Sequence, residues 1–468
     1  MAKFVNREKE LSALETFWQQ KKSQLVIVYG KRRVGKSRLC LKFANNKPSI
    51  YFLAEKLPAN LQLSKLSRQI GEFFQDNLVA KQGIESWELL FEYLAQKREK
   101  LVLIIDEFPY LVEAEPAIPS IFQKGWDLYL AKSPIFLILC GSSVSMMLES
   151  TLSVKAPLYG RRSGQLLVRP FDFPVLSKFF PKKNFEERIK ILGILGGTPA
   201  YLEAFSEKLS LEENLKQTVL AKEHALYQEV EFLLREELRE PRNYFAILTA
   251  IAQNNTKLGE IMNHTGFDKP TTSRYLSILQ NLDLITREVP ITEKRPEKSK
   301  RGIYKLKDEF FRFWFTFVFP HRDKLEAENK KYVLDILEEK KEEFFSFTYE
   351  NIAVDILRKA LEEYKLPFSF EKYGRWWNSH AEIDFVGLCE KERTILFGEV
   401  KYSKQKIGLN ELNKLKEKAK LIDWQKTKQK EVYAFFSKSG FNKKLLEVAK
   451  EEGLLLFQGD KLLTKPLC

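Results

Sequence analysis

The sequence is poor in cysteine and has no long apolar run. Its four cysteines, Cys40, Cys140, Cys389 and Cys468, are too scattered to form a CxxC zinc site or to suggest a disulfide framework. By pattern Cys40 lies in an apolar helix and Cys140 in an apolar strand, which indicates reduced, structural residues. No apolar run reaches the roughly 18 residues that a membrane span needs, and MAKFVNREKE at the start contains no signal-peptide core. We therefore expect a cytoplasmic protein without a membrane partner.

Charge, in contrast, is plentiful and unevenly distributed. The net charge is +14 over 468 residues, a length that suits roughly two to four domains. Residues 399–468 contain 16 Lys against 9 Asp and Glu, and residues 285–307 contain 8 Lys and Arg against 3 Glu. Such basic stretches suit phosphate backbones, but a lysine-rich solvated surface has the same composition. Charge alone therefore leaves a nucleic-acid partner open.

The clearest motif is a phosphate-binding loop near the N-terminus. A short apolar run at 25–29 precedes GKRRVGKS, and a helical pattern follows. In this strand–loop–helix context the motif G-x-x-x-x-G-K-S binds nucleotide phosphates through backbone N–H groups and the helix N-terminus. Lys36 is predicted to contact the β- and γ-phosphates, and Ser37 is predicted to bind Mg²⁺. We expect the whole loop to contact ATP: Gly30, Lys31, Arg32, Arg33, Val34, Gly35, Lys36, Ser37 and Arg38.

A second apolar strand is predicted to supply the acidic groups of the ATPase. Residues 101–105 are consecutive apolar residues and end in Asp106 and Glu107. We predict that Asp106 holds Mg²⁺ and that Glu107 polarises the attacking water. Paired with the P-loop, this strand end predicts ATP hydrolysis.

Two further segments are candidates for sensing the γ-phosphate. The apolar run at 135–140 is followed by Gly-Ser-Ser at 141–143, which offers polar groups at the end of a third buried strand. Arg161 and Arg162 could each act as an arginine finger, within the chain or between two copies. Paired arginines are more often surface charge, so both interpretations stay open.

Together these segments resemble a known family. FVNREKEL at 4–11, the P-loop, the strand that ends in Asp106-Glu107, and GGTPAYL at 196–202 resemble the archaeal-type ATPases of the STAND branch of AAA+ proteins, over roughly residues 1–240. The resemblance implies that the N-terminal segment lines the adenine pocket and that a Gly-x-Pro segment of the lid lies near the base. The residues concerned are Phe4, Val5, Asn6, Arg7, Glu8, Gly197, Thr198 and Pro199.

The middle of the chain predicts a winged helix. Residues 243–284 read as three short helices, and residues 285–308 read as two strands joined by a basic turn. If this domain binds DNA, residues 271–274 would face the groove and the cations of 294–301 would hold phosphates. Alternatively, the winged helix only contacts a partner or covers the ATPase. The aromatic run FFRFWFTFVFP, residues 310–320, has a density typical of a buried core rather than of a base-stacking surface.

The last part of the chain predicts a restriction-endonuclease-like domain. A helix carries Glu350, the second strand of a hairpin carries Asp384, and the next strand, FGEVKYS, carries Glu399 and Lys401. Side chains alternate along a strand, so Glu399 and Lys401 should share one face. This order matches the PD-(D/E)xK nuclease core, in which Asp384 and Glu399 would bind a divalent metal. Lys401 would orient the attacking water, and Glu350 would support the site. A silent fold kept for binding or assembly is the alternative.

The predicted fold class is α/β, with a P-loop NTPase core, a helical lid, a winged helix and a restriction-endonuclease-like domain. The predicted boundaries are 1–180 for the ATPase core, 181–240 for the lid, 241–320 for the winged helix, 321–342 for a helical connector and 343–468 for the nuclease-like domain. We expect an ATP- and Mg²⁺-dependent nucleotide switch coupled to DNA binding, with DNA cleavage and homo-oligomerisation left open. The alternative is a STAND-type regulatory ATPase whose C-terminal domain is catalytically silent and only binds nucleic acid or partners.

Overall fold

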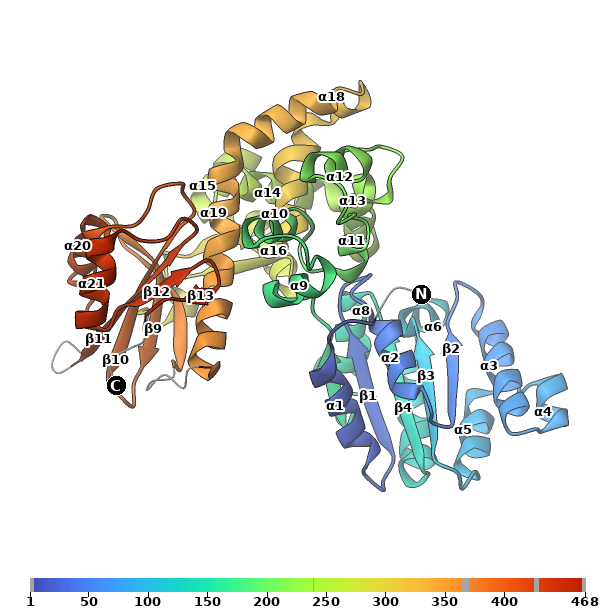
Figure 1. Ribbon diagram of the computed structural model, residues 1–468. Coiled ribbons are helices and arrows are strands. Elements are labelled where there is room, and N and C mark those ends of the chain that lie inside the picture. Colours follow the sequence, from blue (N-terminus) through green and yellow to red (C-terminus); the bar gives the residue numbers. More distant parts are fainter. Residues whose placement is uncertain (1–3, 239, 364–369, 425–428, 465–468) are drawn as a thin grey trace. The chain divides into compact units, whose positions relative to one another are not determined.

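The fold was analysed in a computed structural model, which describes residues 4–238, 240–363, 370–424 and 429–464 (Figure 1). The contacts divide the chain into two units. The first comprises Met1–Pro170, Thr198–Ala200 and Leu233–Arg239, and the second comprises Phe171–Gly197, Tyr201–Phe232 and Glu240–Cys468. Within the described ranges, no helix is both long enough and apolar enough to cross a membrane.

A parallel sheet forms the centre of the first unit, with the strand order β2-β3-β4-β1-β5. β1, β3 and β4 are nearly continuous runs of buried residues, as expected for strands covered on both faces. Parallel strands end at the same edge of the sheet, so the P-loop after β1 and the ends of β3 and β4 lie along one edge. The strands are β1 (Gln24–Tyr29), β2 (Ser49–Leu53), β3 (Leu101–Asp106), β4 (Ile135–Gly141) and β5 (Gly164–Leu167).

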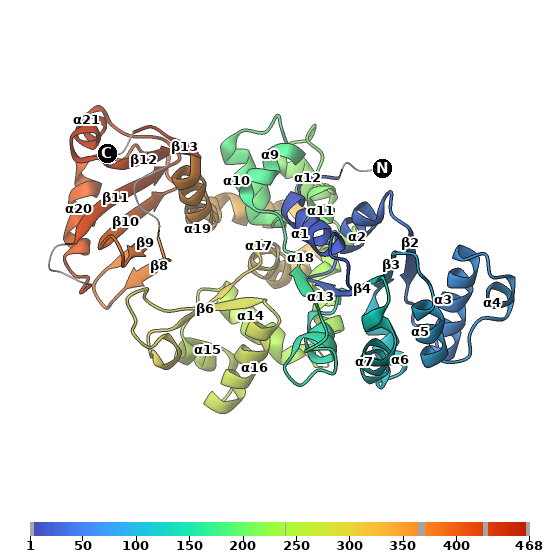
Figure 2. The ribbon, with the colours of Figure 1, turned by 90° about the horizontal axis from the view of Figure 1, so that it is seen from below.

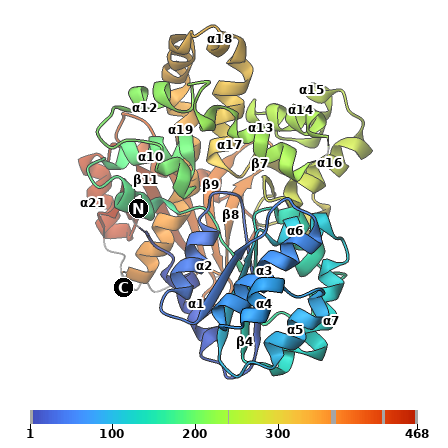
Figure 3. The same cartoon turned by 90° about the vertical axis from the view of Figure 1, so that its right-hand side faces the viewer.

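Helices cover both faces of this sheet, which confirms the predicted P-loop NTPase core. α1 and α2 pack Leu14, Leu39 and Phe43 against one face, and α3, α5, α6 and α7 pack an aromatic-rich cluster against the other. Figure 3 shows the two groups of helices on opposite sides of the strands. The helices are α1 (Glu8–Trp18), α2 (Lys36–Ala44), α3 (Ala59–Phe73), α4 (Asn77–Gln82), α5 (Trp87–Ala95), α6 (Phe108–Ala114), α7 (Ile118–Leu128) and α8 (Val144–Met147).

The second unit begins with short helices and continues into the winged helix. The early helices are α9 (Leu176–Phe179), α10 (Phe185–Leu195), α11 (Pro199–Leu202), α12 (Leu211–Gln217) and α13 (Ala225–Glu237), of which α11 and the end of α13 are shared with the first unit. The winged helix has the predicted three helices and two antiparallel strands. These are α14 (Pro241–Ala252), α15 (Leu258–Thr265), α16 (Lys269–Asn281), β6 (Ile285–Glu288) and β7 (Ile303–Leu306).

The aromatic run after the winged helix is core. It forms α17 (Glu309–Phe313) and a π-helical turn, η5 (Trp314–Val318). Phe313, Trp314 and Phe317 are fully buried, and the Trp314 indole Nε1 donates a hydrogen bond to the Tyr227 carbonyl oxygen of α13 at 2.7 Å. The prediction of a buried core is therefore confirmed.

A six-stranded mixed sheet forms the C-terminal part, with the order β13-β12-β11-β10-β9-β8. α19 (Lys330–Glu363) covers one face, and α20 (Leu409–Ala419) and α21 (Lys443–Glu452) cover the other (Figure 2). A short helix, α18 (Arg322–Glu326), precedes α19. The strands are β8 (Lys372–Trp377), β9 (Glu382–Cys389), β10 (Thr394–Lys401), β11 (Lys430–Ser437), β12 (Leu455–Gln458) and β13 (Lys461–Leu462).

The predicted helical connector is not separate from the C-terminal domain. α19 runs without a break from Lys330 to Glu363, across the expected boundary at 342/343. Its buried positions, among them Leu337, Phe345 and Ile356, continue along the helix on both sides of that boundary. One long helix therefore serves as both the connector and the predicted Glu350 helix.

Candidate functional site

The P-loop has the local geometry that its glycines predict. Gly35 adopts φ 92° just before α2, a conformation that favours glycine. Gly30 adopts φ 148°, and a Cβ atom there would lie 2.3 Å from the Val168 carbonyl oxygen, so a side chain is excluded. Lys36 is buried, and its Nζ donates to the Lys31 carbonyl oxygen at 2.9 Å. The ammonium group thus lies within the curve of the loop, where phosphate oxygens would accept its hydrogen bonds.

The N-terminal segment is fastened to the P-loop by Arg7. This buried guanidinium donates to the carbonyl oxygens of Val34 at 2.9 Å and Arg169 at 2.7 Å, and it pairs with Glu10 at 2.8 Å. Asn6 and Arg7 both have positive φ, 60° and 82°, in a region that asparagine tolerates better than most residues. The segment predicted to line the adenine pocket is therefore held beside the phosphate loop, although its contact with adenine stays a prediction.

Tyr51 is close to both predicted Mg²⁺ ligands. Its hydroxyl donates to Asp106 Oδ2 at 2.6 Å, and the Ser37 side chain lies near enough to influence the pKa of this hydroxyl. Burial, followed by the adjacent Asp106 carboxylate, raises the pKa of Tyr51, so the phenol stays protonated and acts as a donor. Ser37, in the first turn of α2, and Asp106, at the end of β3, thus both lie near Tyr51 at the sheet edge. Tyr51 carries no motif signal, and sequence reasoning missed it.

Glu107 and Ser142 meet at the same edge. Ser142 donates to Glu107 Oε2 from its hydroxyl at 2.8 Å and from its backbone N–H at 3.3 Å. Glu107 has φ 53°, an uncommon left-handed conformation for a residue of this size. The predicted water-polarising residue is therefore oriented by the Gly-Ser-Ser segment that was predicted to sense the γ-phosphate.

The two predicted arginine fingers make local contacts. Arg161 forms a two-point ion pair with Asp127, at 3.2 and 3.0 Å. Arg162 donates to carbonyl oxygens at the end of the π-turn that follows α8, both at 3.1 Å, and its guanidinium stacks on Tyr159. Their role as fingers stays a prediction. Pro199 begins α11, is buried, and belongs to the unit that contains the P-loop.

The winged helix exposes part of the predicted nucleic-acid surface. At the start of α16, Ser273 and Arg274 are exposed, but Thr272 is fully buried and its hydroxyl donates to the Asp268 carbonyl oxygen at 2.8 Å. The expectation that Thr272 faces a DNA groove is therefore wrong, because its position on the helix points into the core. The five cations of the wing are all exposed: Lys294, Arg295, Lys298, Lys300 and Arg301.

The predicted carboxylates of the C-terminal domain lie next to each other. In the β9–β10 pairing Phe385 is opposite Gly398, so Asp384 and Glu399 follow as neighbours on adjacent strands. Asp384 Oδ2 accepts a hydrogen bond from the Val400 backbone N–H at 2.9 Å. The structure thus brings the two predicted metal ligands to one end of the hairpin.

Glu399 is paired with two lysines. Its Oε1 accepts hydrogen bonds from Lys401 Nζ at 2.9 Å and from Lys418 Nζ at 3.0 Å, and its side chain is only 8% exposed. Lys401 therefore shares a strand face with Glu399, as predicted. Lys418 comes from α20. The sequence pattern did not mark it as a site residue, because lysines are in general excess in this part of the chain.

The pKa of Asp384 is raised to about 7. Desolvation is the main cause, and the charges of Glu399 and Glu350 are the next. Glu350 in turn pairs with Arg375 at 3.1 Å, and Arg375 also pairs with Glu382. Lys401, Lys418 and Arg375 thus neutralise parts of the cluster. No group of three or more His, Cys, Asp or Glu within the described ranges is placed to hold a metal ion. Two carboxylates, Asp384 and Glu399, remain as the donor set.

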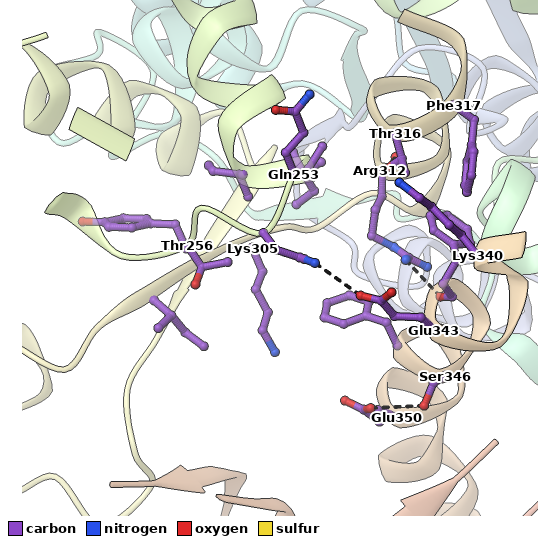
Figure 4. A pocket seen from close by; sticks show the side chains of 18 of the residues that line it. Gln253, Thr256, Lys305, Arg312, Thr316, Phe317, Lys340, Glu343, Ser346 and Glu350 are labelled. Atoms are coloured by element: carbon purple, nitrogen blue, oxygen red, sulfur yellow. Dashed lines mark hydrogen bonds between the residues drawn. The ribbon is translucent and has the colours of Figure 1, made fainter. Parts of the chain in front are cut away.

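A cavity of about 800 Å³ adjoins this cluster within the second unit. It lies between the winged helix and α19, and Figure 4 shows Lys305 and Glu350 extending towards it from these two elements. Lys305 is buried and pairs with Glu288 at 2.9 Å. Desolvation, then the nearby Arg375, lowers the pKa of Lys305. The winged helix therefore places a cation beside the Glu350 end of the carboxylate cluster.

Three family models match the chain. Residues 4–205 match an ATPase domain predominantly from Archaea, residues 245–287 match a bacterial regulatory protein of the arsR family, and residues 314–419 match archaeal and bacterial proteins of unknown function. An uncharacterized protein of Methanocaldococcus jannaschii is 38% identical over 401 residues, which cover 85% of this chain and 87% of the relative.

One solved structure shares the fold of about two thirds of the chain. The Walker-type ATPase of Pyrococcus abyssi aligns with a TM-score of 0.50 and 23% identity, over 67% of this chain and 96% of that chain. The ORC2 protein of Aeropyrum pernix aligns with a TM-score of 0.43 and 13% identity, over 70% and 96%. The extent of the M. jannaschii match, the archaeal ATPase model and the P-loop geometry lead to the same conclusion. The chain belongs to the family of archaeal-type ATPases that carry a winged helix and a C-terminal domain of unknown function, and it is an ATPase.

Proposed function

We propose that this ATPase is a Mg²⁺-dependent nucleotide switch that controls DNA binding by its winged helix. The observation that supports DNA binding most directly is the exposed cationic wing on a domain that matches a family of regulatory proteins. Lys294, Arg295, Lys298 and Lys300 are exposed there within a turn of the chain. Cations in this arrangement bind phosphates without regard to base sequence.

The donor groups at the sheet edge suit ATP with Mg²⁺. Ser37 offers a hydroxyl and Asp106 a carboxylate, and both are oxygen ligands of the kind that Mg²⁺ prefers. Mg²⁺ bound there would neutralise charge on the β- and γ-phosphates. Lys36 would hold the same phosphates from the loop, and Glu107 would orient and polarise the attacking water.

The switch is tested by measuring DNA affinity in two nucleotide states. Fluorescence anisotropy of a labelled duplex is followed with the full chain, without nucleotide and with ATP and Mg²⁺, in a Glu107→Gln background that retains ATP. We expect the dissociation constant to differ by about fivefold or more between the states, the lower end of common allosteric couplings. Lys36→Ala is the control and should show no nucleotide effect. Equal affinities would contradict the switch, and absent binding would contradict DNA as the partner.

A second candidate function is metal-dependent DNA cleavage, which the adjacent Asp384 and Glu399 favour. Crowded, desolvated carboxylates raise the pKa of Asp384, and a cation between them would relieve that repulsion. The two ammonium groups on Glu399 act in the opposite direction, because a metal would have to share or displace them. The same pairs would stabilise a catalytically silent domain that serves a regulatory ATPase.

Cleavage is tested with plasmid, linear and single-stranded DNA in the presence of Mg²⁺ or Mn²⁺. If the site is active, Asp384→Ala and Glu399→Ala should each abolish cleavage and the Mn²⁺ binding seen by calorimetry. Lys401→Ala should slow cleavage but retain Mn²⁺ binding, because it removes no ligand. Glu390→Ala, which changes an exposed carboxylate beyond the end of β9, is the control. A parent protein that neither binds Mn²⁺ at this cluster nor cleaves any DNA form would leave the silent, regulatory domain.

A further inference from the structure

The end of α13 carries two adjacent glutamates that contact the ATP site within the first unit. Residues 233–238 belong to this unit, and Leu234 and Leu238 are buried there. Because residues three apart share a helix face, Glu237 lies on the same face of α13 as Leu234, and Glu236 lies beside it. The end of the helix therefore packs against the ATPase core, and this packing fixes where its two carboxylates lie.

Glu236 contacts the phosphate loop. Its carboxylate forms an ion pair with the Arg32 guanidinium, the third residue of the P-loop motif. Both side chains are partly exposed, 46% for Arg32 and 43% for Glu236, so water and an incoming anion can reach them. Glu236 therefore places a negative charge beside the loop that binds triphosphate.

Glu237 contacts the N-cap and the first two residues of α8, just after the end of β4. Its Oε1 accepts a hydrogen bond from the Val144 backbone N–H at 3.0 Å. Its Oε2 accepts hydrogen bonds from the Ser145 hydroxyl at 2.7 Å and from the Ser145 backbone N–H at 3.3 Å, and the Ser143 hydroxyl lies at 3.4 Å. One carboxylate thus binds three consecutive residues and fixes the shape of this segment.

The residue just before these three is Ser142, which holds Glu107. A continuous set of contacts therefore leads from Glu237 through these residues to Ser142 and on to the carboxylate that polarises water. The adjacent Glu236 reaches the other side of the site, the P-loop. A single helix end contacts both the phosphate-binding and the water-activating parts of the ATPase.

We propose that Glu236 and Glu237 are positioning residues for ATP hydrolysis, with opposite effects on binding and turnover. Glu236 is the counter-ion of Arg32, and ATP competes with it for that guanidinium. Glu237 keeps Ser142, and through it Glu107, in position for the hydrolytic step. This inference rests on the role proposed for Glu107, which Glu107→Gln tests separately.

The test is a comparison of ATP affinity and kcat in the full chain. Glu236→Gln removes a negative charge and one ion-pair partner of Arg32, so the ATP dissociation constant should fall about two- to fivefold, in the range expected for exposed ion pairs. Glu237→Ala should lower kcat about tenfold while the ATP dissociation constant changes less than about twofold. A residue that only stabilises the fold would weaken ATP binding or leave it unchanged, and would not tighten it.

A double-mutant cycle separates positioning from general damage. If Glu237 acts through Ser142, the double variant Glu237→Gln/Ser142→Ala should have a kcat no lower than that of the single variant with the lower kcat. The losses do not add when two residues act through the same set of contacts. Glu237→Gln keeps the size of the side chain and one oxygen acceptor, so it provides the test if the alanine variant does not fold. Glu240→Gln, the same charge change at an exposed residue just beyond the helix, is the control.

Three outcomes would overturn the proposal. The first is an ATP affinity of Glu236→Gln that is equal to or weaker than that of the parent. The second is a parental kcat in both Glu237 variants. The third is strictly additive losses in the cycle. If Glu107→Gln abolishes hydrolysis but these effects are missing, only the inference about Glu236 and Glu237 is wrong. If Glu107→Gln hydrolyses ATP at the parental rate, the role proposed for Glu107, on which the inference rests, is wrong.

Discussion

At the scale of single residues, Glu107 combines an uncommon backbone conformation with a specific partner. Its φ of 53° costs on the order of 1 kcal/mol for a residue with a Cβ atom. The two hydrogen bonds from Ser142 hold the side chain in return. Strained residues concentrate at functional sites, and this one follows Asp106 at the end of a buried strand.

We therefore predict that binding and turnover of ATP can be separated at this site. Glu107→Gln should retain ATP binding and lose at least about 100-fold in kcat, because an amide cannot act as the base. Lys36→Ala should lose ATP binding itself, since its ammonium lies within the loop. Fluorescent-nucleotide titration and phosphate release measure the two properties. Parental turnover in Glu107→Gln would refute the assignment of this strand end.

A second residue-scale prediction concerns Asp355 on α19, in the second unit. Burial, then the neighbouring Asp172, raises the pKa of Asp355 from 3.8 to about 6. Between about pH 4 and pH 6 the folded protein holds a proton here that the unfolded chain does not, so stability falls as the pH rises through this window. Above about pH 6 the ionised carboxylate destabilises the fold.

Asp355→Asn removes this ionisation. We expect it to raise the free energy of unfolding by about 1 kcal/mol near pH 8, a value reduced from the full pKa shift because the side chain is partly solvated. Near pH 4 the gain should disappear. Thermal melting at the two pH values measures the difference, and Asp335→Asn, an exposed position on the same helix, is the control. A gain that is larger at low pH would contradict the stated direction.

At the scale of elements, the wing joins two parts of the second unit. Ile291 at its base packs into the core of the C-terminal sheet, and its backbone N–H donates to the Arg375 carbonyl oxygen of β8 at 2.9 Å. Arg287 of β6 donates to the carbonyl oxygens of Pro296 and Ser299 within the turn. The base of the wing is therefore fixed while its cationic tip stays exposed.

This arrangement predicts a phosphate-binding role for the tip. Replacing Lys294, Arg295, Lys298, Lys300 and Arg301 with Ala should weaken duplex binding with little sequence preference. It should also flatten the slope of log affinity against log salt, by about 0.9 for each phosphate that the variant no longer binds. Anisotropy over a range of salt concentrations measures both quantities.

A matched variant controls for total charge. Alanine replaces five exposed lysines of the first unit in this variant: Lys9, Lys21, Lys22, Lys42 and Lys81. It lowers the net charge by the same amount and should leave the slope close to that of the parent. An unchanged slope in the wing variant would make the winged helix an assembly element.

At the scale of the whole molecule, the two compact units predict separate responses to ATP. All of the residues predicted to contact the phosphates of ATP and the Mg²⁺ bound with it lie in the first unit, so ATP should stabilise that unit directly. Calorimetry should show two unfolding transitions, and ATP with Mg²⁺ should stabilise one of them by about 2.7 kcal/mol when ATP is a hundredfold above its dissociation constant. Lys36→Ala or a chelator should remove or reduce this shift. An equal shift of both transitions would show that the units unfold together.

The features that depend on spacing along the chain could be predicted from the sequence. The P-loop glycines, the strand that ends in Asp106-Glu107 and the shared face of Glu399 and Lys401 all follow from local geometry, because a turn or a strand places near neighbours in a fixed way. Helical periodicity and aromatic density likewise predicted the winged helix and the buried run after it. Thr272 was the exception. It was expected to be exposed together with its neighbours at the start of α16, but it is buried in the core.

Which distant groups meet depends on the packing of the whole chain. Tyr51 donates to Asp106, Lys418 donates to Glu399, and Glu237 accepts from the start of α8, each across intervening chain. No periodicity links such residues, since their proximity follows from strand order and from the packing of helices onto sheets. Tyrosines, lysines and glutamates are also common on surfaces, so their residue types carry no signal of their own. The motifs were local, but the partners that orient them were set by the fold.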